Sequence, residues 1–269
     1  MEMSEQKVVI LGCGWLGQFV GASFVKNGAS VFGSYRRAEV ADTLDQMGIQ
    51  GFELDFNESA IIPDDILKDT THVFVFITPS AAKRVSYDAL LVELLEQFNQ
   101  DVKVIFSSST GIYPKDEGTY DETFALNQDI PNRLLPAETA LRSLLGNRLN
   151  ILRLAGLIGP KRHPAYNLSG REILNNGMNP INLIHASDII AAIDWLLNND
   201  YFGHTYNLVN PYHPPKSDYY PKAAEYFGIE PPKFGSENAT NRLVTGNAIE
   251  EETSFRYRHA LDNFGDFIR

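Results

Sequence analysis

The first 155 residues alternate between short apolar runs and longer segments in which apolar residues recur at helical spacing. The run at 73–77, Val-Phe-Val-Phe-Ile, contains no polar residue, as expected for a parallel strand that is covered on both faces. The runs and their bounding turn residues predict strands at 7–11, 30–34, 52–54, 73–77, 102–106, 150–154, 181–184 and 206–209.

Between these runs, apolar residues three and four positions apart give each segment one apolar helical face. The segment 83–99 is the clearest, because Leu90, Leu91, Leu94 and Leu95 share that face. Helices are predicted at 15–27, 38–47, 83–99, 133–146, 189–197 and 219–227. Strand and helix alternate from the start of the chain, so the sequence predicts an α/β fold with a doubly wound parallel sheet.

The alternation weakens after residue 155. Residues 156–180 are rich in Gly, Pro and Asn, and from 228 onward the pattern predicts no further element. The sequence shows no internal repeat and no low-complexity linker. We therefore expect 156–269 to complete the sheet and to form a small lobe folded against it, rather than an independent domain.

A glycine-rich turn follows the first apolar run and opens the first predicted helix. Gly12, Gly14 and Gly17 form G-x-G-x-x-G, and the three glycines have separate expected tasks. Gly12 permits a tight turn, Gly14 lets the backbone approach a pyrophosphate, and Gly17 lets the helix pack closely on the strand. A plain turn is the alternative, but the strand and helix on either side favour a Rossmann-type dinucleotide loop. Its expected cofactor contacts are Gly12, Cys13, Gly14, Trp15, Leu16 and Gly17.

The residues after the second strand indicate which dinucleotide binds. A carboxylate there accepts hydrogen bonds from the ribose 2′-hydroxyl, whereas arginines pair with a 2′-phosphate. This chain has Tyr35, Arg36 and Arg37 at that place and no acid before Glu39, which favours NADP and leaves NAD as the second choice. The alternative is that both arginines are solvated loop charges. Asp55, just after the third strand, is either a contact to the adenine or an ordinary loop residue.

Composition narrows the class of protein. The 269 residues include 23 Lys and Arg against 34 Asp and Glu, a formal charge of −11 that disfavours nucleic acid and anionic membrane as partners. The single cysteine, Cys13, excludes an intrachain disulfide and a multi-cysteine metal site, and it is expected to be a packing residue. The histidines have no metal-ligand spacing, and we expect no metal. We find no apolar stretch typical of a signal peptide or membrane span, and we expect a cytoplasmic protein.

Five short segments carry a more specific signal when taken in order. They are 12–17 (Gly-Cys-Gly-Trp-Leu-Gly), 106–114 (Phe-Ser-Ser-Ser-Thr-Gly-Ile-Tyr-Pro), 152–160 (Leu-Arg-Leu-Ala-Gly-Leu-Ile-Gly-Pro), 182–188 (Asn-Leu-Ile-His-Ala-Ser-Asp) and 206–208 (Tyr-Asn-Leu). Together they resemble the extended branch of the short-chain dehydrogenase/reductase superfamily, the NAD(P)-dependent epimerases and dehydratases. The resemblance implies a seven-stranded Rossmann sheet, with a dinucleotide-binding core at 1–155 and a substrate-binding lobe at 156–269.

The resemblance also implies a catalytic set that this chain holds only in part. The family uses a serine at the end of the fifth strand, and Ser109 matches it, with Thr110 beside it. The family's tyrosine and lysine, four residues apart on the next helix, have no match. Tyr113 is the nearest phenol to Ser109, and it is either a replacement acid or a structural aromatic residue. The pair Tyr212 and Lys216 has the right spacing, but two prolines between them prevent a common helical face.

Two functions remain open on these grounds. The first is an NADP-dependent oxidoreductase or epimerase for a small polar or nucleotide-sugar-type substrate bound at the carboxyl edge of the sheet, where Thr78 and Ser107 are also expected to contact the cofactor. The second is a non-catalytic NADP-binding module with a redox-sensing or regulatory role. The resemblance further implies a homodimer that pairs through the helices at 83–99 and 133–146.

Overall fold

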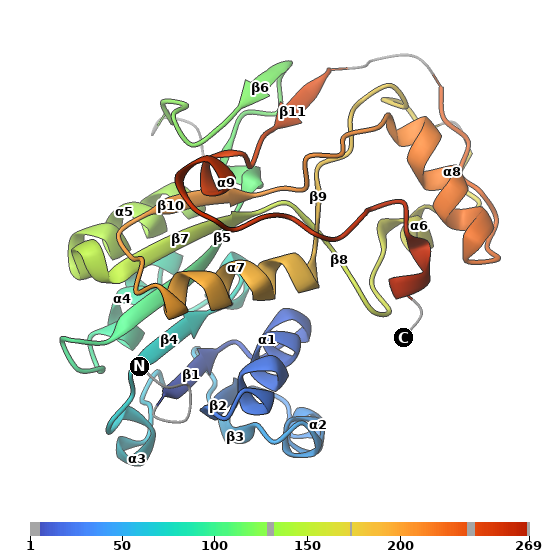
Figure 1. Ribbon diagram of the computed structural model, residues 1–269. Coiled ribbons are helices and arrows are strands. Elements are labelled where there is room, and N and C mark those ends of the chain that lie inside the picture. Colours follow the sequence, from blue (N-terminus) through green and yellow to red (C-terminus); the bar gives the residue numbers. More distant parts are fainter. Residues whose placement is uncertain (1–5, 128–131, 173, 236–239, 268–269) are drawn as a thin grey trace. The chain divides into compact units, whose positions relative to one another are not determined.

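A computed structural model describes residues 6–127, 132–172, 174–235 and 240–267. Seven strands form one sheet in the order β3-β2-β1-β4-β5-β7-β10 (Figure 1). Their bounds are β1 (Lys7–Leu11), β2 (Ser30–Tyr35), β3 (Gln50–Glu53), β4 (His72–Val75), β5 (Lys103–Ser109), β7 (Leu149–Leu154) and β10 (Thr205–Leu208). The predicted α/β fold with a Rossmann-type parallel sheet of seven strands is confirmed.

The helices of the structure are α1 (Trp15–Lys26), α2 (Glu39–Gln46), α3 (Asp64–Leu67), α4 (Tyr87–Leu95), α5 (Leu134–Leu145), α6 (Pro164–Leu168), α7 (Ala186–Asn198), α8 (Lys216–Tyr226) and α9 (Ala248–Glu252). Four of them, α1, α2, α4 and α5, lie within the predicted segments and are shorter. Helices α7 and α8 each begin three residues before the predicted start, and the short helices α3, α6 and α9 were not predicted. Within the described ranges, no helix has the length and apolar character needed to cross a membrane.

The chain divides into two compact units. The first unit holds Met1–Ser108, Asn127–Leu152 and Ile193–Thr205, and the second holds Ser109–Leu126, Arg153–Ala192 and Tyr206–Arg269. Each unit therefore gathers segments that are far apart in the sequence.

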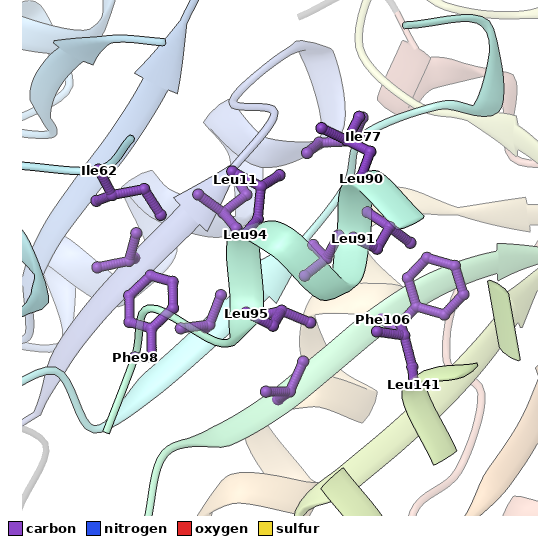
Figure 2. Packing of buried hydrophobic residues seen from close by; sticks show 14 of the residues in the cluster. Leu11, Ile62, Ile77, Leu90, Leu91, Leu94, Leu95, Phe98, Phe106 and Leu141 are labelled. Carbon is purple, nitrogen blue, oxygen red and sulfur yellow. The ribbon is translucent and has the colours of Figure 1, made fainter. Parts of the chain in front are cut away.

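The main core of the first unit lies between the sheet and the helices α4 and α5. Alternate strand residues, such as Leu11 and Phe106, face the leucines of α4 (Figure 2). Leu141 of α5 belongs to the same cluster. The intervening strand residues face the other way, where Phe24 of α1 meets Phe74 edge to face at 5.2 Å. Because helices cover both faces, the strands read as continuous apolar runs.

The second unit contains short strands, and of these only β9 overlaps a strand predicted from the sequence, the one at 181–184. Two parallel pairs of three-residue strands join β8 (Gly156–Ile158) to β9 (Leu183–His185) and β6 (Gly118–Tyr120) to β11 (Arg242–Val244). A separate apolar cluster lies under α6 and α8. It consists of Ile158, Ala165, Ile181, Leu183, Tyr219, Tyr220, Ala223, Leu261 and Phe264.

Candidate functional site

The glycine-rich loop joins β1 to α1 in the first unit, and Gly12 makes its turn. Gly12 has φ +86°, and a Cβ there would lie 2.9 Å from the backbone N of Ile77. Its N–H donates to the Ser34 hydroxyl at 2.8 Å, and the Cys13 N–H donates to the Ser34 carbonyl at 3.0 Å. Only glycine meets both the conformation and the close approach at this position.

Gly14 and Gly17 differ from Gly12 in what surrounds them. Gly14 is exposed, has φ −82°, and a Cβ there would meet nothing within 4 Å. A Cβ on Gly17 would lie 3.1 Å from Ile10 Cγ2 and 3.2 Å from the Gly12 carbonyl oxygen. Gly17 therefore belongs to the contact between helix and strand, while Gly14 leaves open space at the start of α1.

A cavity of about 390 Å³ opens beside this loop, within the range of small-molecule sites. Seven of the residues predicted to contact a cofactor line it, and they are Gly12, Cys13, Gly14, Tyr35, Arg36, Arg37 and Thr78. The other lining residues are Ser34, Val40, Phe56, Phe76, Ile77, Ser80, Ala81 and Lys83. Five further predicted residues lie outside the lining, namely Trp15, Leu16, Gly17, Asp55 and Ser107.

The cavity is cationic although the whole chain carries a formal charge of −11. Arg36, Arg37 and Lys83 line it, and among the described residues no Asp or Glu does. In the described ranges, the side chains of these three residues form no ion pair or hydrogen bond. Their charges are therefore available to an anion. Lys83 is the first residue of the predicted helix 83–99, whereas in the structure α4 begins only at Tyr87 and Lys83 lies in the loop before it.

Cys13 packs inside the loop. Its side chain is buried, and a Cβ added to Gly33 would lie 2.8 Å from its Sγ. Burial raises the pKa of the Cys13 thiol to about 12, so the group stays a neutral thiol near pH 7. This environment matches the expected packing role rather than a nucleophile.

Asp55 and Ser107 are engaged within the protein. The Asp55 carboxylate accepts hydrogen bonds from the backbone and side-chain N–H groups of Asn57 at 2.9 and 3.3 Å. The Ser107 hydroxyl donates to the Val75 carbonyl at 3.1 Å. Both side chains therefore tie loops and strands of the first unit together.

The three catalytic candidates lie at the start of the second unit. Ser109 ends β5, and its hydroxyl accepts the Gly111 N–H at 3.0 Å. The Tyr113 phenol is buried; it donates to Asn207 Oδ1 at 2.9 Å and accepts from Arg153 at 2.8 Å. Burial raises the pKa of Tyr113, and the Arg153 guanidinium opposes that rise. The phenol is thus held by two partners inside a polar network.

A second cavity of about 490 Å³ lies within the second unit. Thr110 contributes to it, whereas Ser109 and Tyr113 are outside its lining. The remaining lining residues are Lys115, Gly156, Pro164, Asn176, Asn179, Pro180, Ile181, Asn182, Leu183, Lys216, Tyr220, Thr240 and Arg242. Within the described part of the chain, no Asp or Glu lines this cavity, and no cluster of three His, Cys, Asp or Glu side chains is arranged to hold a metal.

The polar side chains of the second cavity fall into two groups. Arg242 donates to the carbonyls of Pro114 and Thr110 at 2.6 and 2.7 Å, so it supports the wall. The ammonium groups of Lys115 and Lys216, by contrast, have no hydrogen-bond or ion-pair partner among the described residues. Burial, with the nearby Arg242 charge, lowers the pKa of Lys216. The positive charges of these two lysines are therefore available to an anion in this cavity. No sequence motif points to Lys115, and Lys216 enters the sequence prediction only as the partner of Tyr212.

Comparison with known proteins agrees with this architecture. No family model matches the chain. The chain is 31% identical over 266 residues to Protein YeeZ of Escherichia coli (strain K12), with 94% of this chain and 96% of that protein covered.

Two solved structures share the fold. The UDP-glucuronic acid 4-epimerase of Bacillus cereus in complex with NAD has TM-score 0.79 and 16% identity, with 97% of each chain covered. MoeE5 in complex with UDP-glucuronic acid and NAD has TM-score 0.76 and 19% identity, again with 97% of each chain covered. The chain therefore belongs to the family of Protein YeeZ, and it shares the fold of the UDP-glucuronic acid 4-epimerase and of MoeE5.

Proposed function

We propose that the protein binds NADP at the cavity beside the glycine-rich loop and acts as an oxidoreductase or epimerase. The observation that supports this most is the joint presence of Gly14, open at the start of α1, and the guanidinium groups of Arg36 and Arg37 in one cavity. The open space at Gly14 leaves room for a pyrophosphate, and the two guanidinium groups match the charge of a 2′-phosphate.

The cofactor, when bound, would accept or donate a hydride. Gly12, Cys13 and Gly14 would hold its pyrophosphate, while Tyr35, Arg36 and Arg37 would hold the phosphorylated ribose. The two fold relatives described above are complexes with NAD. NADP remains our choice for this chain because its loop offers two cations where a carboxylate would bind the 2′-hydroxyl of NAD.

The substrate we propose is a small polar anion of the nucleotide-sugar type, bound in the second cavity. Lys115 and Lys216 supply positive charge there, and the lining has no acidic residue in the described ranges. The amides of Asn179 and Asn182 are used by the chain itself, since they bond to the segment 240–244. The substrate proposal therefore rests on charge recognition by the two lysines. MoeE5, which shares the fold, is described in complex with UDP-glucuronic acid, a ligand of this class.

Ser109 and Thr110 are the residues we propose to act on this substrate. Thr110 lines the substrate cavity, and Ser109 precedes it at the end of β5. Tyr113 is better explained as a positioning residue, because its hydroxyl is already bonded to Asn207 and Arg153.

The cofactor assignment is tested by Arg36→Ala. We expect roughly a tenfold loss of NADP affinity with NAD affinity unchanged, because an exposed charged hydrogen bond to the 2′-phosphate is lost. Lys26→Ala removes an exposed charge at the end of α1, outside the cavity, and serves as the control. Equal weakening of NADP and NAD by Arg36→Ala would exclude the 2′-phosphate assignment.

A non-catalytic, redox-sensing module is the second candidate, since the family's tyrosine and lysine pair has no match in this sequence. NADPH oxidation with a panel of keto and nucleotide sugars separates the two candidates. Turnover with any member supports the enzyme, whereas tight NADP binding without turnover supports the module.

We also propose a homodimer formed through α4 and α5, and a cytoplasmic location. The two helices pack together in the first unit, and a free buried thiol at Cys13 is compatible with a reducing compartment. Light scattering on the purified chain tests the first proposal.

A further inference from the structure

We infer that Lys83 is a third cation for the 2′-phosphate of NADP. Asn57 holds the backbone of Lys83 by a hydrogen bond, and Asp55 orients Asn57. The inference rests on the proposed function, since it concerns the same cavity. It assigns a specificity role to the loop after β4, whereas the sequence placed specificity only at the end of β2.

The two adjacent cations of this loop have different surroundings. Lys83 is exposed and lines the cavity together with Arg36 and Arg37. Arg84 is outside the lining, and its Nη2 donates to both carboxylate oxygens of Glu93, at 2.7 and 2.9 Å. The charge of Arg84 is therefore compensated within the protein, while that of Lys83 faces the cavity.

Asn57 fixes the backbone from which Lys83 projects. The Asn57 side-chain N–H donates to the Ala81 carbonyl at 3.1 Å, and its side-chain carbonyl accepts the Lys83 N–H at 2.9 Å. Asp55 in turn orients Asn57 by accepting its backbone N–H at 2.9 Å. The turn after β3 therefore sets the position of Lys83 relative to the cavity.

A 2′-phosphate is the part of NADP that best matches three cations. It carries a charge of roughly −1.5 to −2 near pH 7 and has three oxygens that accept hydrogen bonds. Two guanidinium groups and one ammonium group can each donate to a different oxygen. The pyrophosphate, by contrast, is expected at the Gly14 end of the cavity, and NAD carries it as well.

Binding of NADP and NAD to Lys83→Gln, measured by calorimetry, tests the inference. We expect NADP affinity to fall by roughly tenfold with NAD affinity unchanged. Arg84→Gln, which removes the neighbouring paired charge, should leave the ratio of the two affinities as in the wild type. Asn57→Ala should lower that ratio in the same direction, because Lys83 loses its fixed backbone.

The outcomes are distinguishable. A wild-type protein that prefers NADP, combined with an unchanged preference in Lys83→Gln, would overturn the inference and leave the proposed function standing. Equal losses for NADP and NAD would also overturn it, because Lys83 would then bind a part that the two cofactors share. A wild-type protein that binds neither nucleotide would overturn the proposed function itself. Thermal unfolding of each variant shows that the fold is retained.

Discussion

Gly14→Ala separates the role of the loop in binding from its role in folding. In the structure, Gly14 has φ −82°, which other residues adopt, and a Cβ there meets nothing within 4 Å. The substitution therefore introduces a methyl group only into the space that a pyrophosphate would occupy. Gly12→Ala is the matched comparison, because it adds the same methyl group two residues earlier in the same loop.

The two variants should differ strongly in stability. Gly14→Ala loses only the small preference for Gly over Ala at a helix N-cap, about 0.5–1 kcal/mol. Gly12→Ala has a backbone cost of about 1–2 kcal/mol for a left-handed residue at φ +86°. It also has a steric cost of about 1–3 kcal/mol, because its Cβ lies 2.9 Å from the Ile77 N. The free energy of unfolding should thus fall by about 2–5 kcal/mol.

Urea unfolding and NADP calorimetry on both variants measure these effects. We expect Gly14→Ala to unfold close to the wild type and to bind NADP at least a hundredfold more weakly, since the pyrophosphate loses several charged hydrogen bonds. Normal NADP binding by Gly14→Ala would refute the proposed pyrophosphate site at the glycine-rich loop. Equal destabilisation by Gly14→Ala and Gly12→Ala would refute the steric reasoning.

Two further predictions concern the second cavity and the pH dependence of stability. Lys216→Gln should weaken binding of UDP-glucuronic acid by roughly tenfold, because it removes a positive charge from the cavity. Lys222→Gln on the same helix should leave binding unchanged, because Lys222 is exposed and paired with Asp218 at 2.8 Å. Equal effects of the two substitutions would contradict the assignment of Lys216 to the binding site. Burial, with the nearby Lys103 charge, lowers the pKa of His72 to about 4, so the unfolded chain binds the extra proton between about pH 6.5 and 4. The free energy of unfolding should therefore decrease by at most about 3 kcal/mol as the pH falls through that window, and His72→Leu should show a flatter profile.

Much of the sheet could be predicted from the sequence, because each buried strand is itself a continuous run of apolar residues. Val73 and Phe74 face opposite sides of β4, yet both are fully buried, and a run without polar residues reports that directly. Among the three-residue strands of the second unit, β9 overlaps the predicted strand at 181–184, whereas β6, β8 and β11 gave no such signal. Arg242 pairs with Gly118 across more than a hundred residues, and three residues are too few to show a period.

Candidate-site residues could be predicted where a local sequence motif indicates a specific turn or a specific ligand group. Gly12 and the arginines after β2 follow from the requirements of a tight turn and of phosphate recognition. The placement of Lys83 and Lys216 in the two cavities could not be predicted, because a lysine in a loop or at a helix start is ordinary in sequence and its surroundings come from residues distant in the chain. Tyr113 shows the same limit, since its partner Arg153 lies forty residues away and decides how the phenol is used.

Calorimetric titration of the wild-type protein with NADP and with NAD tests the central claim most directly. The glycine-rich loop beside the cations Arg36, Arg37 and Lys83 should bind NADP, and it should bind NAD at least tenfold more weakly. The ratio of the two affinities should decrease as salt is added. The absence of measurable binding for either nucleotide would contradict the account.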